Sequence, residues 1–199
     1  MIVCAPVKRK SPSDDKPLNE VVKQAVKYAE QSMKSIGHVP PTLLAQTPDG
    51  LIIHTPREME DERHKNNFAN TARMIAVAHD ATAVAVILES WMTSAREGKP
   101  LDPSIPPAES PDRDECVVIQ AEANGAAKTK FLSIQRNSNR KFTGFSCDHP
   151  DLNKDEMQGR FVGILPPKQA SLENKKMAKQ VLMVMGIVTD NKGFNPMWN

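Results

Sequence analysis

The 199-residue sequence predicts an α+β fold, in which three helices pack on a central, mainly antiparallel sheet of about five to six strands. Three observations favour this fold. One strand-like run has apolar side chains on both of its faces, two pairs of strand-like runs each flank a turn, and three segments show helical periodicity. Consecutive hairpins place their strands antiparallel in one sheet, and the helices then supply the layers that cover it.

The central strand is predicted at residues 82–92, TAVAVILESWM. Successive side chains point to opposite faces, and both faces are apolar until Glu89 and Ser90, which is typical of a strand buried on both sides. Ordering such a run costs about as much free energy as burying its side chains gains. The strand therefore needs a covering layer on each face, which the rest of the chain has to provide.

The chain begins with a leader and a helix. Residues 1–16 are polar and rich in turn-forming residues, so we expect a flexible leader ahead of a single domain that spans 17–188. Apolar residues recur at intervals of three and four from about 18 to 36 and predict a helix. Asn19 is expected to cap its start, and Gly37 stands where a left-handed C-terminal cap is favoured.

A hairpin and a second helix follow. Two apolar runs flank the turn sequence PDG and predict a hairpin over 42–55. Thr55 is then expected to cap a helix, because proline follows at the first helical position and Glu58 at the third, as in a capping box. This helix is expected to run to about His79 and to lead directly into the central strand.

The second half of the chain begins with residues 94–114, whose five prolines and many charges predict a long loop. The remaining strands are expected at 116–122, 128–136, 140–147 and 160–165. The order of elements is similar to that of profilin-like and roadblock-type proteins, in which helices sandwich five antiparallel strands. This resemblance of element order implies a sheet that is covered by helices on both faces.

A last helix is predicted at 171–185, and Gly186 ends it. Its apolar residues form two adjacent stripes, one of Met177, Val181 and Val184 and the other of Ala178, Leu182 and Met185. Residues 189–199 form a C-terminal tail that carries three large apolar groups, Phe194, Met197 and Trp198. We expect this tail either to fold back onto its own domain or to anchor a protein partner or a second copy of the chain.

Composition and cysteine usage limit the classes of protein to which the chain can belong. Lys and Arg number 26 against 24 Asp and Glu, so the net charge of +2 exerts no general attraction on nucleic acid or membranes. No apolar run approaches the length needed to span a bilayer, and the start, MIVCAPVKRK, does not have the order of a secretory signal. Cys4, Cys116 and Cys147 form no CxxC pair. We therefore expect a cytoplasmic protein without membrane contact, in which Cys116 is a buried strand residue.

No enzymatic signature stands out. The chain lacks the phosphate-binding GxxxxGK[ST], the dinucleotide-binding GxGxxG, the GxSxG of hydrolases, and the HExxH and HxH spacings of metal sites. No catalytic residue, metal or cofactor is therefore assigned, and a non-catalytic protein is expected rather than an enzyme. An unrecognised active site near the end of the central strand would need His54, His79, Asp80 and Glu89 to converge, which the sequence leaves open.

One basic and aromatic stretch suggests an alternative function. Residues 123–147 contain no acidic residue, and phenylalanines alternate there with Lys and Arg, as in surfaces that hold single-stranded nucleic acid. The candidate contacts within 128–145 are Lys128, Lys130, Phe131, Arg136, Arg140, Lys141, Phe142 and Phe145. The competing interpretation is a hairpin whose phenylalanines face the core, with its charge neutralised by the acidic residues that follow from Asp148 to Glu156.

These patterns favour a non-catalytic binding or assembly module of the cytoplasm that acts through protein–protein contacts. Its partner would be another protein or a second copy of the chain. Two alternatives stay open: binding of single-stranded nucleic acid through 128–145, and an enzyme with an unrecognised site near the end of the central strand.

Overall fold

The computed structural model describes residues 16–93, 102, 104–123, 125–147, 149–153, 157 and 159–187. The tail at 189–199 and nearly all of the leader lie outside the described residues, as does most of the first half of the 94–114 loop. The helices are α1 (Lys16–Ile36), α2 (Glu62–Ala78) and α3 (Leu172–Val184), with a short 3₁₀ turn, η1, at Pro107–Glu109. The strands are β1 (Thr42–Thr47), β2 (Gly50–His54), β3 (Ala83–Met92), β4 (Asp114–Ala123), β5 (Ala126–Arg136), β6 (Phe142–Ser146) and β7 (Leu152–Asn153).

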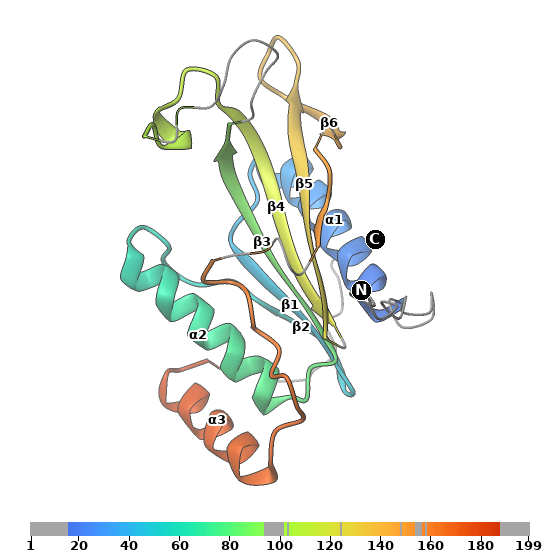
Figure 1. Cartoon of the computed structure of the whole chain (residues 1–199), viewed down its shortest axis with the longest axis vertical. Coiled ribbons are helices and arrows are strands. Elements are labelled where there is room, and N and C mark those ends of the chain that lie inside the picture. The colour runs from blue at the N-terminus through green and yellow to red at the C-terminus, as the bar shows by residue number, and fades with distance from the viewer. Residues whose placement is uncertain are drawn as a thin grey trace, which may run out of the picture.

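The strands form one curled antiparallel sheet, which confirms the predicted fold class. Their order is β2-β1-β3-β4-β5-β6, and the two-residue β7 pairs with β5. Both predicted hairpins are present, β1 with β2 and β4 with β5. Figure 1 shows α1 on one face of the sheet and α2 on the other, while β3, β4 and β5 extend beyond both helices. None of the described helices has the length and apolar character needed to cross a membrane.

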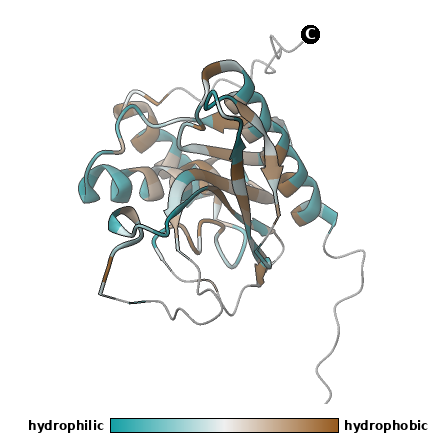
Figure 2. Ribbon diagram, turned by 90° about the horizontal axis from the view of Figure 1, so that it is seen from above, coloured by the Kyte–Doolittle hydropathy of each residue, from teal (hydrophilic) through white to brown (hydrophobic). Residues whose placement is uncertain are grey.

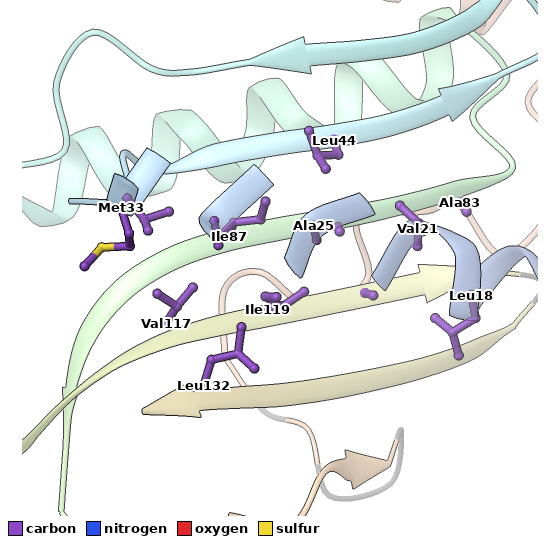
Figure 3. Packing of buried hydrophobic residues seen from close by; sticks show 14 of the residues in the cluster. Leu18, Val21, Ala25, Met33, Leu44, Ala83, Ile87, Val117, Ile119 and Leu132 are labelled. Carbon is purple, nitrogen blue, oxygen red and sulfur yellow. The ribbon is translucent and has the colours of Figure 1, made fainter. Parts of the chain in front are cut away.

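The central strand β3 separates two hydrophobic cores, as its two-sided apolar pattern predicts. Ala83, Ala85 and Ile87 pack on the α1 side, whereas Val84 and Val86 pack on the α2 side. Figure 3 shows the α1 side, where the helix interdigitates with β1, β3, β4 and β5 through Leu18, Val21, Ala25, Met33, Leu44, Ile87, Ile119 and Leu132. Hydropathy follows the same division in Figure 2, with hydrophobic ribbon at the strands and hydrophilic ribbon on the outer sides of the helices. Burial ends at Ile87, because the strand then leaves the space between the helices.

The start of α1 differs from the prediction. The helix is already formed at Lys16, so Asn19 lies inside it and does not cap it. Leu18 lies in the first turn of the helix and is almost fully buried in the α1-side core. The predicted end is confirmed: Gly37 has a φ of +79°, and its N–H donates to the carbonyl of Met33 at 3.2 Å.

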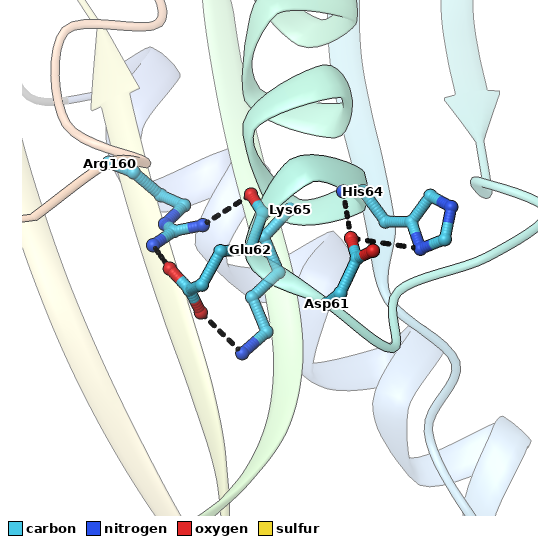
Figure 4. A network of polar contacts seen from close by, with 5 residues as sticks. All are labelled: Asp61, Glu62, His64, Lys65 and Arg160. Atoms are coloured by element: carbon cyan, nitrogen blue, oxygen red, sulfur yellow. Dashed lines mark hydrogen bonds and ion pairs between the residues drawn. The ribbon is translucent and has the colours of Figure 1, made fainter.

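The start of α2 also differs, because the cap is Asp61 rather than Thr55. The Oδ1 atom of Asp61 accepts a hydrogen bond from the N–H of His64 at 2.7 Å, as Figure 4 shows. The hydroxyl of Thr55 instead lies 3.3 Å from the hydroxyl of Thr42, beside the end of the β1–β2 hairpin. The residues between Thr55 and Asp61 cross from the hairpin to the helix and place Met59 against the α2-side core. Tertiary packing thus selects the later of two capping residues.

Residues 160–165 form no strand, contrary to the prediction. Their backbone groups bind two side chains instead of a neighbouring strand. The guanidinium of Arg73 donates to three carbonyl groups, those of Arg160, Val162 and Gly163. The carboxylate of Glu122 accepts from three N–H groups, those of Gly163, Ile164 and Leu165. The segment is also attached to the start of α2 by Arg160, whose guanidinium pairs with Glu62 in Figure 4.

Candidate functional site

The last helix packs mainly on α2, below it in Figure 1. Two of its side chains, Ala178 and Leu182, are buried in the α2-side core. The Nζ atom of Lys175 lies 2.8 Å from the Oδ1 atom of Asp80, which follows α2 directly, and both side chains are half-buried. These contacts determine which side of α3 faces α2.

Local sequence determines where α3 begins and ends. The hydroxyl of Ser171 caps its start by accepting from the N–H of Asn174 at 3.2 Å. Gly186 has a φ of +70° and ends the helix as predicted. The N–H of Gly186 donates to the carbonyl of Met183 at 3.0 Å, and the N–H of Ile187 donates to that of Leu182 at 2.9 Å. This is a Schellman motif, and its apolar residue, Ile187, packs back against the α2-side core.

The outer side of α3 carries a row of exposed apolar side chains, here called the α3 stripe. It consists of Met177, Val181, Val184 and Met185, which are 57%, 39%, 87% and 47% exposed as residues. Their spacing of four, three and one residues places them along one side of the helix. Large apolar groups gathered in this way on a surface are typical of a site of protein–protein contact.

The α3 stripe continues the buried face of the helix. Val181 follows Ala178 by three residues, and Met185 follows Leu182 by three, so these two exposed residues each adjoin a buried one on the helix surface. The apolar sector of α3 is therefore broader than the part that α2 covers. None of the four side chains is ionisable, so the stripe offers apolar area and polarisable methionine sulfur but no acid–base chemistry.

The residues that an active site at the end of the central strand would need do not gather in one place. Glu89 lies on the α1 side of β3, where its Oε2 atom accepts from the N–H of Val39 at 2.8 Å. The other three lie on the α2 side: His54 beside the ring of Phe68 at 6.1 Å between centroids, His79 at the C-cap of α2, and Asp80 against Lys175. Burial lowers the pKa of His54 and of His79 below the ordinary value. In the part of the chain that the structure describes, no group of three or more His, Cys, Asp or Glu residues is placed to hold a metal ion.

The basic side chains of the 128–145 stretch lie close to carboxylates. The Nζ atoms of Lys128 and Lys130 are 3.5 and 3.4 Å from the carboxylate of Asp151. The Nε atom of Arg136 lies 2.8 Å from the Oε2 atom of Glu115 on the neighbouring strand. Arg140 and Lys141 are exposed in the turn between β5 and β6. The stretch is thus basic in sequence but partly neutralised in space, since Asp151 and Glu115 lie outside it.

The three phenylalanines of the same stretch occupy different surroundings. Phe142 and Phe145 are only partly exposed, lie 4.9 Å apart between ring centroids, and pack against the α1-side core. Phe131 alternates along β5 with Lys130 and Leu132, so it points to the opposite face of the sheet. Its ring lies edge-on to that of His149, at 6.5 Å. The eight predicted contacts are therefore distributed over both faces and one turn of the hairpin.

Comparisons with known proteins identify no relative of this chain: no family model, no curated protein and no solved structure matches it. Function is therefore inferred from the surface of the chain itself. The sequence places the residues of the α3 stripe on one helix but does not distinguish which of its apolar residues are covered. Met185, which the sequence groups with Ala178 and Leu182, is exposed, whereas those two are buried. The available signal was the width of the apolar sector, which exceeds what one neighbouring helix can bury. The predicted partner contacts Phe194, Met197 and Trp198 lie outside the described residues.

Proposed function

We propose that the protein is a non-catalytic binding or assembly module of the cytoplasm, and that it acts through protein–protein contacts made by the α3 stripe. The observation that supports this proposal is the row formed by Met177, Val181, Val184 and Met185, which is exposed on a helix whose other apolar side is buried. A helix that presents anchors at such spacing fits an apolar groove of a partner protein.

The free energy that the stripe can contribute to binding indicates that the interface with a partner must extend beyond it. Fully burying one Val or Met side chain contributes about 1.5–3 kcal/mol, so the four residues together contribute at most about 6–12 kcal/mol. Association itself costs on the order of 4–15 kcal/mol in lost freedom of motion. The stripe alone therefore does not support tight binding. It acts as the apolar centre of a larger interface that also has a polar rim.

Photo-crosslinking tests the proposal with matched variants. Val184→Glu places a charge in the centre of the stripe, whereas Gln180→Glu adds the same charge at an exposed polar position one turn earlier. We expect the parent and Gln180→Glu, but not Val184→Glu, to crosslink the same protein in cells. Once purified, that protein should bind the parent at least tenfold more tightly than it binds Val184→Glu. A tenfold change in affinity corresponds to about 1.4 kcal/mol. Equal capture and equal affinity for all three chains would exclude the α3 stripe as the contact surface.

Two other functions have weaker support. Binding of single-stranded nucleic acid through 128–145 needs cationic side chains that are free to meet phosphates, and three of the five lie against carboxylates. Fluorescence anisotropy of a labelled oligonucleotide at low salt tests it, and the variant with Glu in place of Lys128, Arg136 and Arg140 is its control. An enzyme at the end of the central strand has less support still, because its four residues lie on two faces of the sheet.

A further inference from the structure

We infer that residues 188–199 of the same chain occupy the α3 stripe through Phe194, Met197 and Trp198, and that a protein partner binds by displacing them. The second half of this inference rests on the proposed function, whereas the contact between tail and helix does not. The tail thus acts as an intramolecular competitor for the site. Three properties of the chain support this: where it leaves α3, how far it reaches, and what its side chains offer.

The chain leaves α3 next to the stripe. Gly186 reverses the direction of the backbone with its φ of +70°, and Ile187 is held against the α2-side core by packing and by its hydrogen bond to Leu182. The last fixed residue therefore lies within one turn of Met185, the C-terminal member of the stripe. Residues 188–199 follow Ile187 directly in the sequence, so no long linker separates them from the helix.

The tail is long enough to run back along the whole stripe. The thirteen residues of α3 span about 20 Å. Phe194 is seven residues beyond Ile187, and an extended chain of that length covers about 23 Å. Trp198 and Met197 have further reach, so each ring or thioether can lie over the stripe without extending the chain fully. Twelve residues are also short enough to keep the tail close to the helix.

Chemistry and tethering favour the chain's own tail over other occupants. Tail and stripe both offer large apolar groups, and the two methionines of the stripe can contact the rings of Phe194 and Trp198 favourably. A short tether gives an effective concentration in the millimolar range. A second copy of the chain at micromolar concentration is about a thousandfold more dilute. The same tail on a neighbouring molecule therefore competes poorly, while a partner with a larger groove can still displace it.

Contact quenching of bimane by tryptophan tests the inference in the full chain. Cys4→Ser and Cys147→Ser remove two thiols, and the buried Cys116 is retained. Bimane is attached through Gln180→Cys, because Gln180 borders the stripe one turn from Val184 and is not part of it. Asn19→Cys, exposed on α1 across the sheet, provides a matched control label. Each labelled chain is compared with its Trp198→Phe counterpart.

The expected result is that Trp198→Phe raises bimane emission at position 180 by about twofold or more, because a tethered tail is bound most of the time. The label at position 19 should not respond, and Val184→Glu should raise emission at position 180 as Trp198→Phe does. Equal emission from both chains labelled at position 180 overturns the inference. Quenching of a labelled Trp198→Phe chain by added unlabelled parent also overturns it, because the occupant is then a second copy.

The two proposals fail in different ways. If Val184→Glu loses partner binding but Trp198 quenches no bimane, the proposed partner-binding site is supported and the contact between tail and stripe is excluded. If Trp198 quenches bimane but no partner depends on the stripe for binding, the contact between tail and stripe is supported and the proposed function is excluded. If both hold, deletion of 188–199 should tighten binding of the purified partner by about tenfold, since the tail no longer competes.

Discussion

Arg73 and Glu122 bind the same residue, Gly163, from two sides of the fold. The Nε atom of Arg73, on α2, donates to the carbonyl of Gly163 at 3.2 Å, and the Oε1 atom of Glu122, on β4, accepts from its N–H at 2.6 Å. Glu122 is only 8% exposed, so its carboxylate depends on the N–H groups of the 163–165 segment in place of water. This clamp holds the segment that leads into α3, and thereby positions the α3 stripe.

Glu122→Gln should lower the free energy of unfolding by about 2–3 kcal/mol, because it removes the charge and turns an amide donor toward backbone donors. Urea unfolding followed by circular dichroism measures the change. Glu115→Gln is the matched control, because it breaks the partly exposed ion pair with Arg136 and should cost only about 0–1 kcal/mol. Equal losses in the two variants would show that the clamp contributes no more than a surface ion pair.

Ile87→Ala should destabilise the protein by about 2–5 kcal/mol, since Ile87 is fully buried in the α1-side core and its truncation leaves a cavity. Leu88→Ala, one residue later, should cost less because the side chain of Leu88 is only half-buried. Thermal unfolding of the two variants compares them directly. A larger loss for Leu88→Ala would contradict the point at which β3 leaves the space between the helices.

Asp61→Asn should lower stability at neutral pH but not in acid. The hydrogen bond from the N–H of His64 holds the pKa of Asp61 below its ordinary value of 3.8, so folding favours the ionised form. That stabilisation is fully present above the unfolded pKa and is lost as the pH falls through the folded pKa. The urea midpoints of parent and variant should therefore converge below about pH 4. Thr55→Ala should change the midpoint less at neutral pH, because Thr55 does not cap α2.

Cys116 should resist thiol reagents in the native protein. Burial, with smaller contributions from Asp114 and Glu89, raises the pKa of its thiol to about 11, so little thiolate forms at neutral pH. Cys147 is exposed and should react. In a Cys4→Ser background, titration with an aromatic disulfide should count one thiol before denaturation and two after it. Cys147→Ser should abolish the native reaction, and a remaining fast thiol would contradict the burial of Cys116.

Features that depend on neighbouring residues were predicted from the sequence. The turn at 48–50, the glycines that end α1 and α3, and the alternation along 82–92 each act over a few residues, and the structure confirms them. The predicted burial of Cys116 in a strand is also confirmed. The sequence also shows that the apolar sector of the last helix is wide, but it does not show which part of that sector is exposed.

Tertiary structure alone decided the features that depend on distant residues. Thr55 and Asp61 are both good helix caps, and the packing of Met59 and the contact between Thr55 and Thr42 selected Asp61. Residues 160–165 were predicted as a strand, but Arg73 and Glu122 bind their backbone groups in place of a strand partner. The ion pairs of the basic stretch with Asp151 and Glu115 form only in the folded chain, because both acidic residues lie outside the stretch in the sequence. Likewise, the fold buries Ala178 and Leu182 of α3 and leaves Met177, Val181, Val184 and Met185 exposed, because burial depends on which surfaces meet and not on the helix by itself.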